Sequence, residues 1–596
     1  MVLYLEKNLK LLTDKMKSRK WDAFLVPRCD MYAGEEVPEN EERLKFISNF
    51  SGSAGYAIIS AKSKIKSVIF SDGRYQLQLK KEVNSKYFNT FNGGFKQVCL
   101  FLNKNKNILK KVVIDPWLLT LSEHEFLQDV IKETKISLEF INKNIIDEIW
   151  LNKPVKTDNE LFKLPIEYTG ETVSSKINRL TKVIKNNNCD FYILFNPTGL
   201  SWLLNIRGRD LKHTPISRSF CIVSKQKGIH IFTDNNTFQN SIKKEKNIHI
   251  CNFEYLSNFL ENSKNKNFLI DAKTLPMKVH NFLVNNKLNY KSISCPVDQF
   301  KTKKNPCELR GFKNAHLKDG LAILNLLFWF EKNVNFKNLS EIEVSEKLLE
   351  IRSLEKTFVC ESFSTISAFG NNGAIIHYKA DNSSNKKINR DGLYLIDTGA
   401  HYLDGTTDTT RTLLVGEAET EMIENYTLVL KGHIAIASAI FPNNIKGRDL
   451  DALARIALWS KGKDYAHGTG HGVGSVLSVH EGPISISKTS DCTIESGMVI
   501  SNEPGYYKNG KYGIRIENLE VVSKYNINKS KENFLHFQNL TRVPLETKLI
   551  NKKMLTKFEI DWVNEYHKKV YENLVKFIET DNEELLNFLK RKTRQI

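Results

Sequence analysis

The sequence has no long apolar run and few cysteines, and both features restrict where the protein works. Its most apolar stretch, LAILNLLFWF at residues 321–330, is far shorter than the roughly 20 residues that a membrane-spanning helix needs. The N-terminal residues MVLYLEKNLKLLTDKMK carry charges where a signal peptide has an apolar core. The nine cysteines are scattered, with no CxxC pair, which is typical of reduced thiols. We therefore expect a cytoplasmic protein without a membrane segment.

The sequence also lacks a recognisable zinc finger, an RNP-type aromatic motif or a basic leucine zipper, although its formal net charge is +19. The positive residues gather in Lys/Asn-rich patches at residues 242–247, 261–267 and 525–533, a composition typical of solvated loops. We interpret the charge as a surface bias and expect no nucleic-acid partner.

With 596 residues, of which 41% are hydrophobic, the chain is long enough for three or four domains. The segments WDAFLVP (21–27), FSGSAGYAIIS (50–60) and VIFSDGRY (68–75) have weaker counterparts in CDFYILFNPTGLSWLLNIRG (189–208), SFCIVS (219–224) and HIFTDNN (230–236). This order predicts two related α/β domains. Linker-like stretches near residues 150–172 and 301–309 indicate the two boundaries between domains. An amphipathic helix is expected near residues 173–187. We therefore expect domains at residues 1–153, 154–303 and 304–596, in an α/β (α+β) fold.

The third region contains a hairpin pattern with two acidic residues. Residues 394–412 read YLIDTGAHYLDGTTDTTRT and include Asp397 and Asp408. A symmetric hairpin that turns at Tyr402 and Leu403 would place these two aspartates directly opposite each other. Like charges so close together repel, and the arrangement is costly unless a cation lies between them. The hairpin therefore predicts a cation site.

Other residues of the metal-ligand types follow in glycine-bounded, strand-like stretches: His467 and His471 in HGTGHGVG, His480 in SVHEGP, Glu503 in SNEPGYY, and Glu517 in GIRIENLE. The spacing of the first two histidines would suit zinc on a helix, but the interleaved glycines argue against a helix there. The glycine-rich stretch has no GK[ST], which argues against a phosphate-binding loop.

A set of four carboxylates and one imidazole favours Mn²⁺ or a similar divalent ion over metals that prefer thiolates. Such a set is too negative for a single ion. Two divalent cations about 3.5–4 Å apart, bridged by two carboxylates and a water, would balance the charge and lower the pKa of that water. The sequence therefore predicts a hydroxide nucleophile directed at a carbonyl group.

These motifs resemble the creatinase-like, or pita-bread, metallopeptidases, and within them the three-domain cytosolic Xaa-Pro aminopeptidases. The matching stretches are LKFISNFSGSAG and SDGRY in the first domain, WLLNIRGRD and the proline of HTP in the second, and ISAFGNNGAIIHY, the aspartate hairpin, HGTGHGVG, NEPGYY and GIRIEN in the third. A C-terminal segment, LTRVPLETKLI followed by WVNEYHKKV, is similar to the tail of the long form. The resemblance implies two creatinase-like domains followed by a pita-bread catalytic domain.

The resemblance also implies residue roles. Asp397 would be a ligand of one metal only, Asp408 and Glu517 would bridge two metals, and His471 and Glu503 would be ligands of the other. Glu503 would in addition move a proton from the nucleophilic water to the leaving nitrogen. The substrate would be surrounded by three histidines, His377, His467 and His480. Arg515 would orient the carboxylates. The family implies two divalent ions, most simply Mn²⁺ with Zn²⁺ or Co²⁺ as alternatives, peptide substrates with proline in the second position, and a homodimer.

Three alternatives remain open on the sequence. Prolidase has this fold but cleaves only dipeptides and is usually shorter. Creatinase has the fold without the metal ligands. Some pita-bread proteins have lost the ligands and bind histones or RNA. The complete ligand set favours an enzyme, namely a metal-dependent aminopeptidase.

Overall fold

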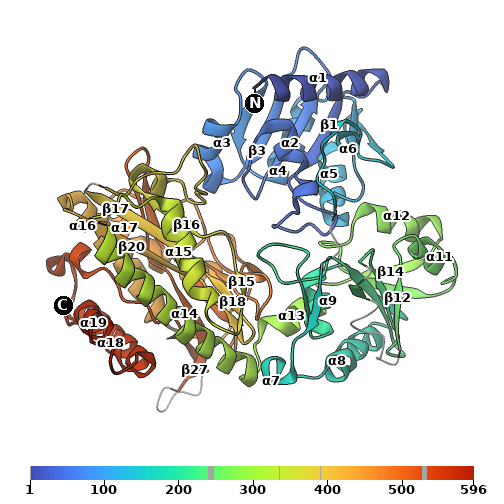
Figure 1. Ribbon diagram of the computed structural model, residues 1–596. Coiled ribbons are helices and arrows are strands. Elements are labelled where there is room, and N and C mark those ends of the chain that lie inside the picture. The colour runs from blue at the N-terminus through green and yellow to red at the C-terminus, as the bar shows by residue number, and fades with distance from the viewer. Residues whose placement is uncertain are drawn as a thin grey trace. The chain divides into compact units, whose positions relative to one another are not determined.

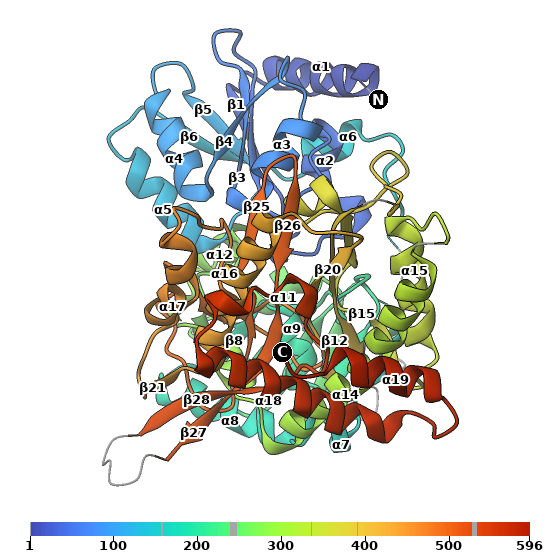
Figure 2. The same ribbon diagram turned by 90° about the vertical axis from the view of Figure 1, so that its left-hand side faces the viewer.

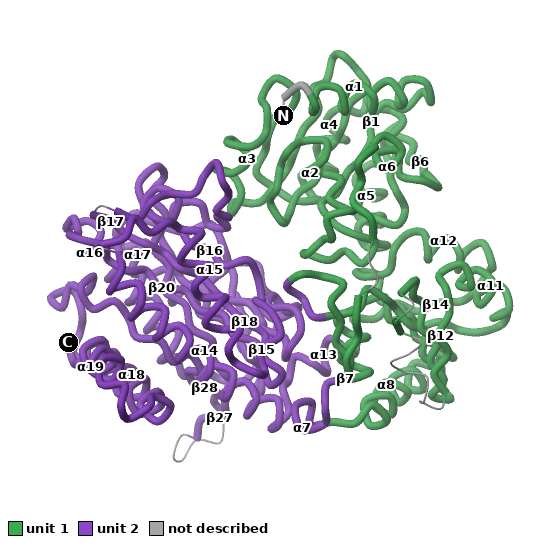
Figure 3. The backbone as a smooth tube through the Cα atoms, in the orientation of Figure 1, with its two compact units in different colours: residues 1–163, 171–212, 216–297 green, residues 164–170, 213–215, 298–596 purple. Residues whose placement is uncertain are grey.

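The computed structural model describes residues 2–156, 159–235, 237–238, 247–334, 336–389, 391–526 and 533–596. The chain forms two compact units (Figure 3). Unit 1 comprises residues 1–163, 171–212 and 216–297, and unit 2 comprises residues 164–170, 213–215 and 298–596. The segments 164–170 and 213–215 thus belong to unit 2, although the chain on both sides of each belongs to unit 1.

Unit 1 contains two six-stranded sheets with equivalent strand orders, β4-β3-β2-β1-β5-β6 and β12-β11-β10-β8-β13-β14. Figure 1 labels β1 and β3 of the first sheet and β12 and β14 of the second. In each sheet the first strand in sequence pairs antiparallel with one neighbour and parallel with the other. The first sheet consists of Ala23–Pro27 (β1), Tyr56–Ser60 (β2), Ser67–Ser71 (β3), Phe88–Asn92 (β4), Lys111–Ile114 (β5) and Ser137–Phe140 (β6). The second consists of Phe191–Leu194 (β8), Phe220–Ser224 (β10), Ile229–Phe232 (β11), Ile248–Cys251 (β12), Asn267–Ile270 (β13) and Asn289–Ser292 (β14). The predicted pair of related α/β folds is confirmed.

The central strands of these sheets are apolar along their whole length because both faces are covered. Every residue of β1 and of β10 is buried, as expected for strands between layers of helices. The helices of unit 1 are Val2–Ser18 (α1), Arg43–Ser48 (α2), Gln76–Glu82 (α3), Phe95–Lys104 (α4), Leu121–Ile131 (α5), Ile145–Ile149 (α6), Val173–Asn186 (α8), Pro197–Leu203 (α9), Tyr255–Glu261 (α11) and Met277–Asn285 (α12). Helix α8 is the amphipathic helix that the sequence predicts near residues 173–187. A two-stranded pair, Leu161–Lys163 (β7) and Ile206–Gly208 (β9), completes the unit.

Unit 2 contains several smaller sheets around one six-stranded sheet of order β21-β28-β27-β24-β22-β23. The strands of unit 2 are Phe358–Glu361 (β15), Ile366–Phe369 (β16), Gly392–Thr398 (β17), Ala400–Tyr402 (β18), Gly405–Thr406 (β19), Thr409–Val415 (β20), Ile440–Pro442 (β21), Gly470–Gly472 (β22), Glu481–Ile486 (β23), Val499–Asn502 (β24), Gly505–Lys508 (β25), Tyr512–Arg515 (β26), Asn518–Tyr525 (β27) and Phe534–Asn539 (β28). Figure 2 shows β27 and β28 side by side. Strands β16, β17 and β20 form a separate sheet.

The helices of unit 2 build its largest apolar core. They are Ile166–Thr169 (α7), Pro296–Thr302 (α13), Pro306–Asn333 (α14), Glu341–Ser353 (α15), Thr420–Ala437 (α16), Gly447–Trp459 (α17), Lys557–Leu574 (α18) and Glu583–Lys592 (α19). Helix α14 begins with a capping box: the Asn305 side chain accepts from the backbone N–H of Glu308 at 3.0 Å, and the Glu308 carboxylate accepts from the Asn305 N–H at 2.9 Å. Its apolar residues, including Leu324, Leu327 and Phe330, pack with β17, β20, α18 and α19 in one cluster.

Within the described residues, no helix is long and apolar enough to cross a membrane. The Lys/Asn-rich patch at 261–267 covers the end of α11 and the loop before β13, and Lys264, Asn265 and Lys266 are exposed. The patches at 242–247 and 525–533 lie largely outside the described residues.

Candidate metal centre

The hairpin that carries Asp397 and Asp408 differs in register from the sequence prediction. Asp397, in β17, pairs with Thr410 and not with Asp408. The predicted turn was wrong: Tyr402 pairs with Gly405, so the turn lies one residue later and the pairing shifts by two residues. Residues two apart on a strand point to the same face, so both aspartates still lie on one face of the hairpin.

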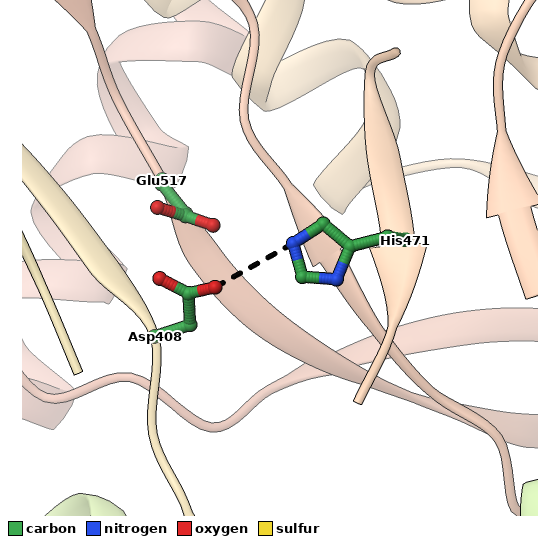
Figure 4. A group of neighbouring side chains, drawn as sticks. All are labelled: Asp408, His471 and Glu517. Atoms are coloured by element: carbon green, nitrogen blue, oxygen red, sulfur yellow. Dashed lines mark ion pairs between the residues drawn. The ribbon is translucent and has the colours of Figure 1, made fainter. Parts of the chain in front are cut away.

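Three side chains from distant parts of unit 2 form a compact cluster (Figure 4). One ligand atom each from Asp408, His471 and Glu517 lies within 4.8 Å of the others. His471 Nε2 is 3.5 Å from Asp408 Oδ2, and His471 Nδ1 is 2.9 Å from the Gly472 carbonyl oxygen. Because a carbonyl oxygen only accepts, Nδ1 carries the hydrogen and Nε2 is left to face the carboxylates. The Gly472 carbonyl therefore fixes Nδ1 as a donor, and Nε2 is the nitrogen that would bind a metal.

Asp397 and Glu503 lie beside this cluster. Glu503 Oε1 is 3.6 Å from His471 Nε2. Asp397 Oδ2 accepts a hydrogen bond from Arg515 Nη2 at 2.5 Å, whereas Asp397 Oδ1 is buried and has no hydrogen-bond partner among the described residues. A buried carboxylate oxygen without a partner is unfavourable, and a cation would satisfy it.

The electrostatics of the cluster also favour a bound cation. Burial and the neighbouring Asp408 carboxylate raise the pKa of Asp397 to about 6, even though Arg515 opposes the shift. Burial, followed by the charge of Asp408, raises the pKa values of Glu503 and Glu517 in the same way. Burial disfavours a charged His471, but the carboxylates of Asp408 and Glu503 outweigh it and raise the pKa of His471 to about 9. Carboxylates gathered in this way fit divalent cations, which stabilise the ionised forms.

Arg515 connects the carboxylates through hydrogen bonds. In addition to Asp397, its guanidinium donates to Tyr507 Oη at 2.6 Å and to Thr410 Oγ1 at 3.1 Å. Thr410 Oγ1 donates in turn to Glu517 Oε2 at 2.7 Å. Sequence reasoning missed Tyr507 and Thr410, although both lie inside the motifs NEPGYY and TDTTRT that it identified.

Two of the three predicted substrate histidines lie near the cluster. His467 Nδ1 is 4.0 Å from Glu503 Oε2, and its Nε2 is 2.9 Å from Tyr507 Oη. The exposed His480 packs edge-on against His471, with ring centroids 4.4 Å apart. Neither His467 nor His471 is helical, as the glycines between them predict.

His377 follows the short helix η3 (Gly370–Ala374) and is half-buried. Buried Glu341 holds this segment in place: its carboxylate accepts from the Asn372 side chain at 2.9 Å and from Tyr378 Oη at 2.8 Å. Helix η3 packs against β26, the strand that ends in Arg515. The segment of His377 is thus fixed beside the strand that supports the carboxylates.

Family models match four consecutive parts of the chain. Two models described as "Creatinase/Prolidase N-terminal domain" match residues 8–142 and 152–308. "Metallopeptidase family M24" matches residues 310–524, and "C-terminal region of peptidase_M24" matches residues 533–596. The carboxylate and histidine cluster lies entirely inside the M24 match.

Relatives extend this similarity over the whole chain. Xaa-Pro aminopeptidase 1 of Dictyostelium discoideum is 36% identical over 614 residues, which cover 99% of this chain and 97% of the relative. A probable Xaa-Pro aminopeptidase P of Blastomyces gilchristii (strain SLH14081) is 37% identical over 618 residues, covering 99% of each. The chain therefore belongs to metallopeptidase family M24.

Solved structures confirm the fold. The crystal structure of X-prolyl aminopeptidase from Caenorhabditis elegans, described as a cytosolic enzyme with a di-nuclear active site, is 32% identical with a TM-score of 0.93, and the match covers 99% of this chain and 100% of that one. The Xaa-Pro dipeptidase from Bacillus anthracis is 24% identical with a TM-score of 0.51 and covers 63% of this chain and 99% of its own, a likeness of fold alone. The predicted succession of two creatinase-like domains and a pita-bread catalytic domain is confirmed.

Proposed function

We propose that the protein is an Xaa-Pro aminopeptidase, a metal-dependent exopeptidase that removes the N-terminal residue from peptides with proline in the second position. One observation carries the proposal: ligand atoms of Asp408, His471 and Glu517 meet within 4.8 Å in a chain similar along its whole length to Xaa-Pro aminopeptidases. Asp397 Oδ1, which has no hydrogen-bond partner in the part of the chain that the structure describes, supports the same reading, because a metal ion would satisfy it.

Five side chains hold two divalent ions in this proposal: Asp397, Asp408, His471, Glu503 and Glu517. By the family resemblance, Asp408 and Glu517 would be shared by the ions, Asp397 would be a ligand of one of them, and His471 and Glu503 would be ligands of the other. When bound, divalent ions would supply Lewis-acid chemistry here: polarisation of the scissile carbonyl group and activation of water at neutral pH. Arg515 holds Asp397 through Oδ2 and so leaves Oδ1 for the metal.

Glu503 moves the proton in this proposal. Its carboxylate lies beside the cluster, with Oε1 3.6 Å from His471 Nε2, where a carboxylate can take up a proton from the attacking water. The nitrogen of an Xaa-Pro bond carries no hydrogen and must receive a proton to leave as an amine. Glu503 delivers that proton; His467 Nδ1 lies 4.0 Å from its Oε2.

His377, His467 and His480 contact the substrate. A tertiary amide offers no N–H for recognition, so the site holds the proline ring by shape and by contacts with these imidazoles. The exposed position of His480 beside His471 supports a role at the mouth of the metal centre.

We also propose the domain boundaries, the identity of the metal ions, the location and the oligomeric state. The domains are residues 1–153, 154–303 and 304–596, and the family matches that begin at residues 152 and 310 support both boundaries. The ions are Mn²⁺, which the oxygen-rich ligand set favours, with Zn²⁺ or Co²⁺ as alternatives. The protein acts in the cytoplasm as a homodimer; the cytosolic relative from Caenorhabditis elegans supports that location.

The experiment is a cleavage assay of the purified protein after chelation, with and without added Mn²⁺. Substrates are tripeptides that begin Xaa-Pro, matched Xaa-Ala tripeptides, and an Xaa-Pro dipeptide. We expect release of the first residue from Xaa-Pro tripeptides, only with metal. Equal release from Xaa-Ala peptides would contradict the specificity, and cleavage of the dipeptide alone would instead indicate a prolidase.

A further inference from the structure

A fully buried ion pair joins two helices of unit 2 beside the aspartate hairpin. Asp319 in α14 is 2% exposed and Arg352 in α15 is 0% exposed. Arg352 Nε donates to Asp319 Oδ1 at 2.8 Å, and Arg352 Nη2 donates to Asp319 Oδ2 at 3.1 Å. This two-pronged geometry is the strongest form of a carboxylate–guanidinium contact.

The same two side chains also bind both strands of the hairpin. Arg352 Nη1 donates to Thr398 Oγ1 at 2.7 Å, and Asp319 Oδ2 accepts from Thr407 Oγ1 at 2.7 Å. Thr398 directly follows Asp397, and Thr407 directly precedes Asp408. One ion pair therefore holds the neighbour of each aspartate, on opposite strands.

The strands are in close contact at this position. A Cβ atom added to Gly399 would lie 2.1 Å from the Thr407 carbonyl oxygen, so only glycine fits there. Ser362 supports both strands: its N–H donates to the Gly399 carbonyl at 3.0 Å, and its Oγ donates to the Thr407 carbonyl at 3.0 Å. The backbone beside the two aspartates is thus held from several directions.

We propose that Asp319 and Arg352 are positioning residues that set the separation of Asp397 and Asp408 for the two metal ions. A shift of either strand would leave a buried charged group with an unsatisfied hydrogen bond, which is costly because both side chains are buried. The pair therefore resists movements of the hairpin that would change the distance between the aspartates. The inference rests on the proposed roles of Asp397 and Asp408 as metal ligands.

The test compares three substitutions that each remove one hydroxyl from this network. Thr398→Val and Thr407→Val remove the contacts next to the aspartates. Tyr402→Phe is the matched control. Tyr402 Oη also donates to Asp319, at 2.9 Å, but Tyr402 lies next to the hairpin turn and is not adjacent to either aspartate. For each variant, the dissociation constant of Mn²⁺ from the chelated protein is measured by calorimetry, and Tm is measured on the same samples.

We expect both valine variants to bind Mn²⁺ about ten-fold more weakly than wild type, which is the usual effect of losing a group that orients a metal ligand. Tyr402→Phe should bind as wild type does, although it also loses a buried hydrogen bond to Asp319 and therefore some Tm. Thr407→Ser keeps the hydroxyl and should restore the affinity. Wild-type affinity in both valine variants, or equal weakening in Tyr402→Phe, would overturn the inference.

Asp408→Asn separates this inference from the proposed function. If Asp408→Asn binds both Mn²⁺ ions with wild-type affinity, the assignment of Asp408 as a ligand fails, and the positioning role fails with it. If Asp408→Asn loses metal but the valine variants do not, the ligand assignment stands and only the positioning role is refuted.

Discussion

Removing the metals should turn Asp397 from a stabilising ligand into a destabilising charge. In the chelated protein its carboxylate has one partner, Arg515, and its other oxygen has none among the described residues. Asp397→Asn keeps an oxygen to accept from Arg515 and removes the charge. At neutral pH the chelated variant should therefore be more stable than chelated wild type.

The magnitude follows from the pKa of Asp397, which burial and Asp408 raise from 3.8 to about 6. A difference of about 2 pKa units corresponds to about 3 kcal/mol. Because the pKa is raised in the folded state, the stabilisation is fully present below about pH 4 and is lost as pH rises through about 6. The advantage of Asp397→Asn should thus be about 3 kcal/mol at pH 7.5 and shrink to about 1 kcal/mol at pH 4.5.

The assay is thermal unfolding of both proteins in chelator at the two pH values, repeated at pH 7.5 with Mn²⁺. At about 2 °C per kcal/mol, the chelated variant should melt roughly 6 °C above chelated wild type at pH 7.5. Mn²⁺ should remove most of this difference, because free ion at one hundred times its dissociation constant stabilises wild type by about 2.7 kcal/mol per site, which nearly equals the advantage of the chelated variant.

The control is Asp404→Asn in the same hairpin, which removes a carboxylate that pairs with Lys318 at 2.9 Å. This variant should gain no Tm in chelator. The reasoning is refuted if chelated Asp397→Asn melts at or below chelated wild type at pH 7.5, or if its advantage is as large at pH 4.5.

Three further predictions concern other parts of the molecule. Burial raises the pKa of Glu520, in β27, to about 8, so the free energy of unfolding of wild type is highest below about pH 4.5 and falls as pH rises through 8. At pH 9 the free energy of unfolding of Glu520→Gln should exceed that of wild type by up to about 5 kcal/mol. The same pH profile for both proteins in denaturant melts would contradict this. His480→Ala and His377→Ala should keep two metal ions by elemental analysis but lose turnover, whereas loss of metal would make these histidines ligands. Excess enzyme should hydrolyse Xaa-Pro peptides in a fast phase and a slow phase that a prolyl isomerase removes, because about 10–30% of such bonds are cis in short peptides; a single fast phase would show that both isomers are accepted.

The sequence by itself determined the features that depend on local chemistry. The apolar strands and turns of unit 1 are repeated in the same order, and both sheets follow from that repetition. The start of α14 follows from local residues: an N-cap Asn305, Pro306 in the first turn, and Glu308, which completes the capping box. The glycines around His471 exclude a helix there, and the motifs containing Asp408 and Glu517 carried the family resemblance.

Only the tertiary structure decided how these residues meet. The hairpin turn was predicted one residue early because turn residues mark a turn but do not set its register, which depends on pairing along both strands. Arg352 and Asp319 lie on separate helices, and neither position has a periodic or motif signal that would distinguish it from a surface charge. Tyr507 and Thr410 likewise acquire a role only through Arg515. Hydrogen bonds between residues far apart in sequence are specified by packing of the whole unit, because burial makes each polar group depend on the partner that the fold brings to it.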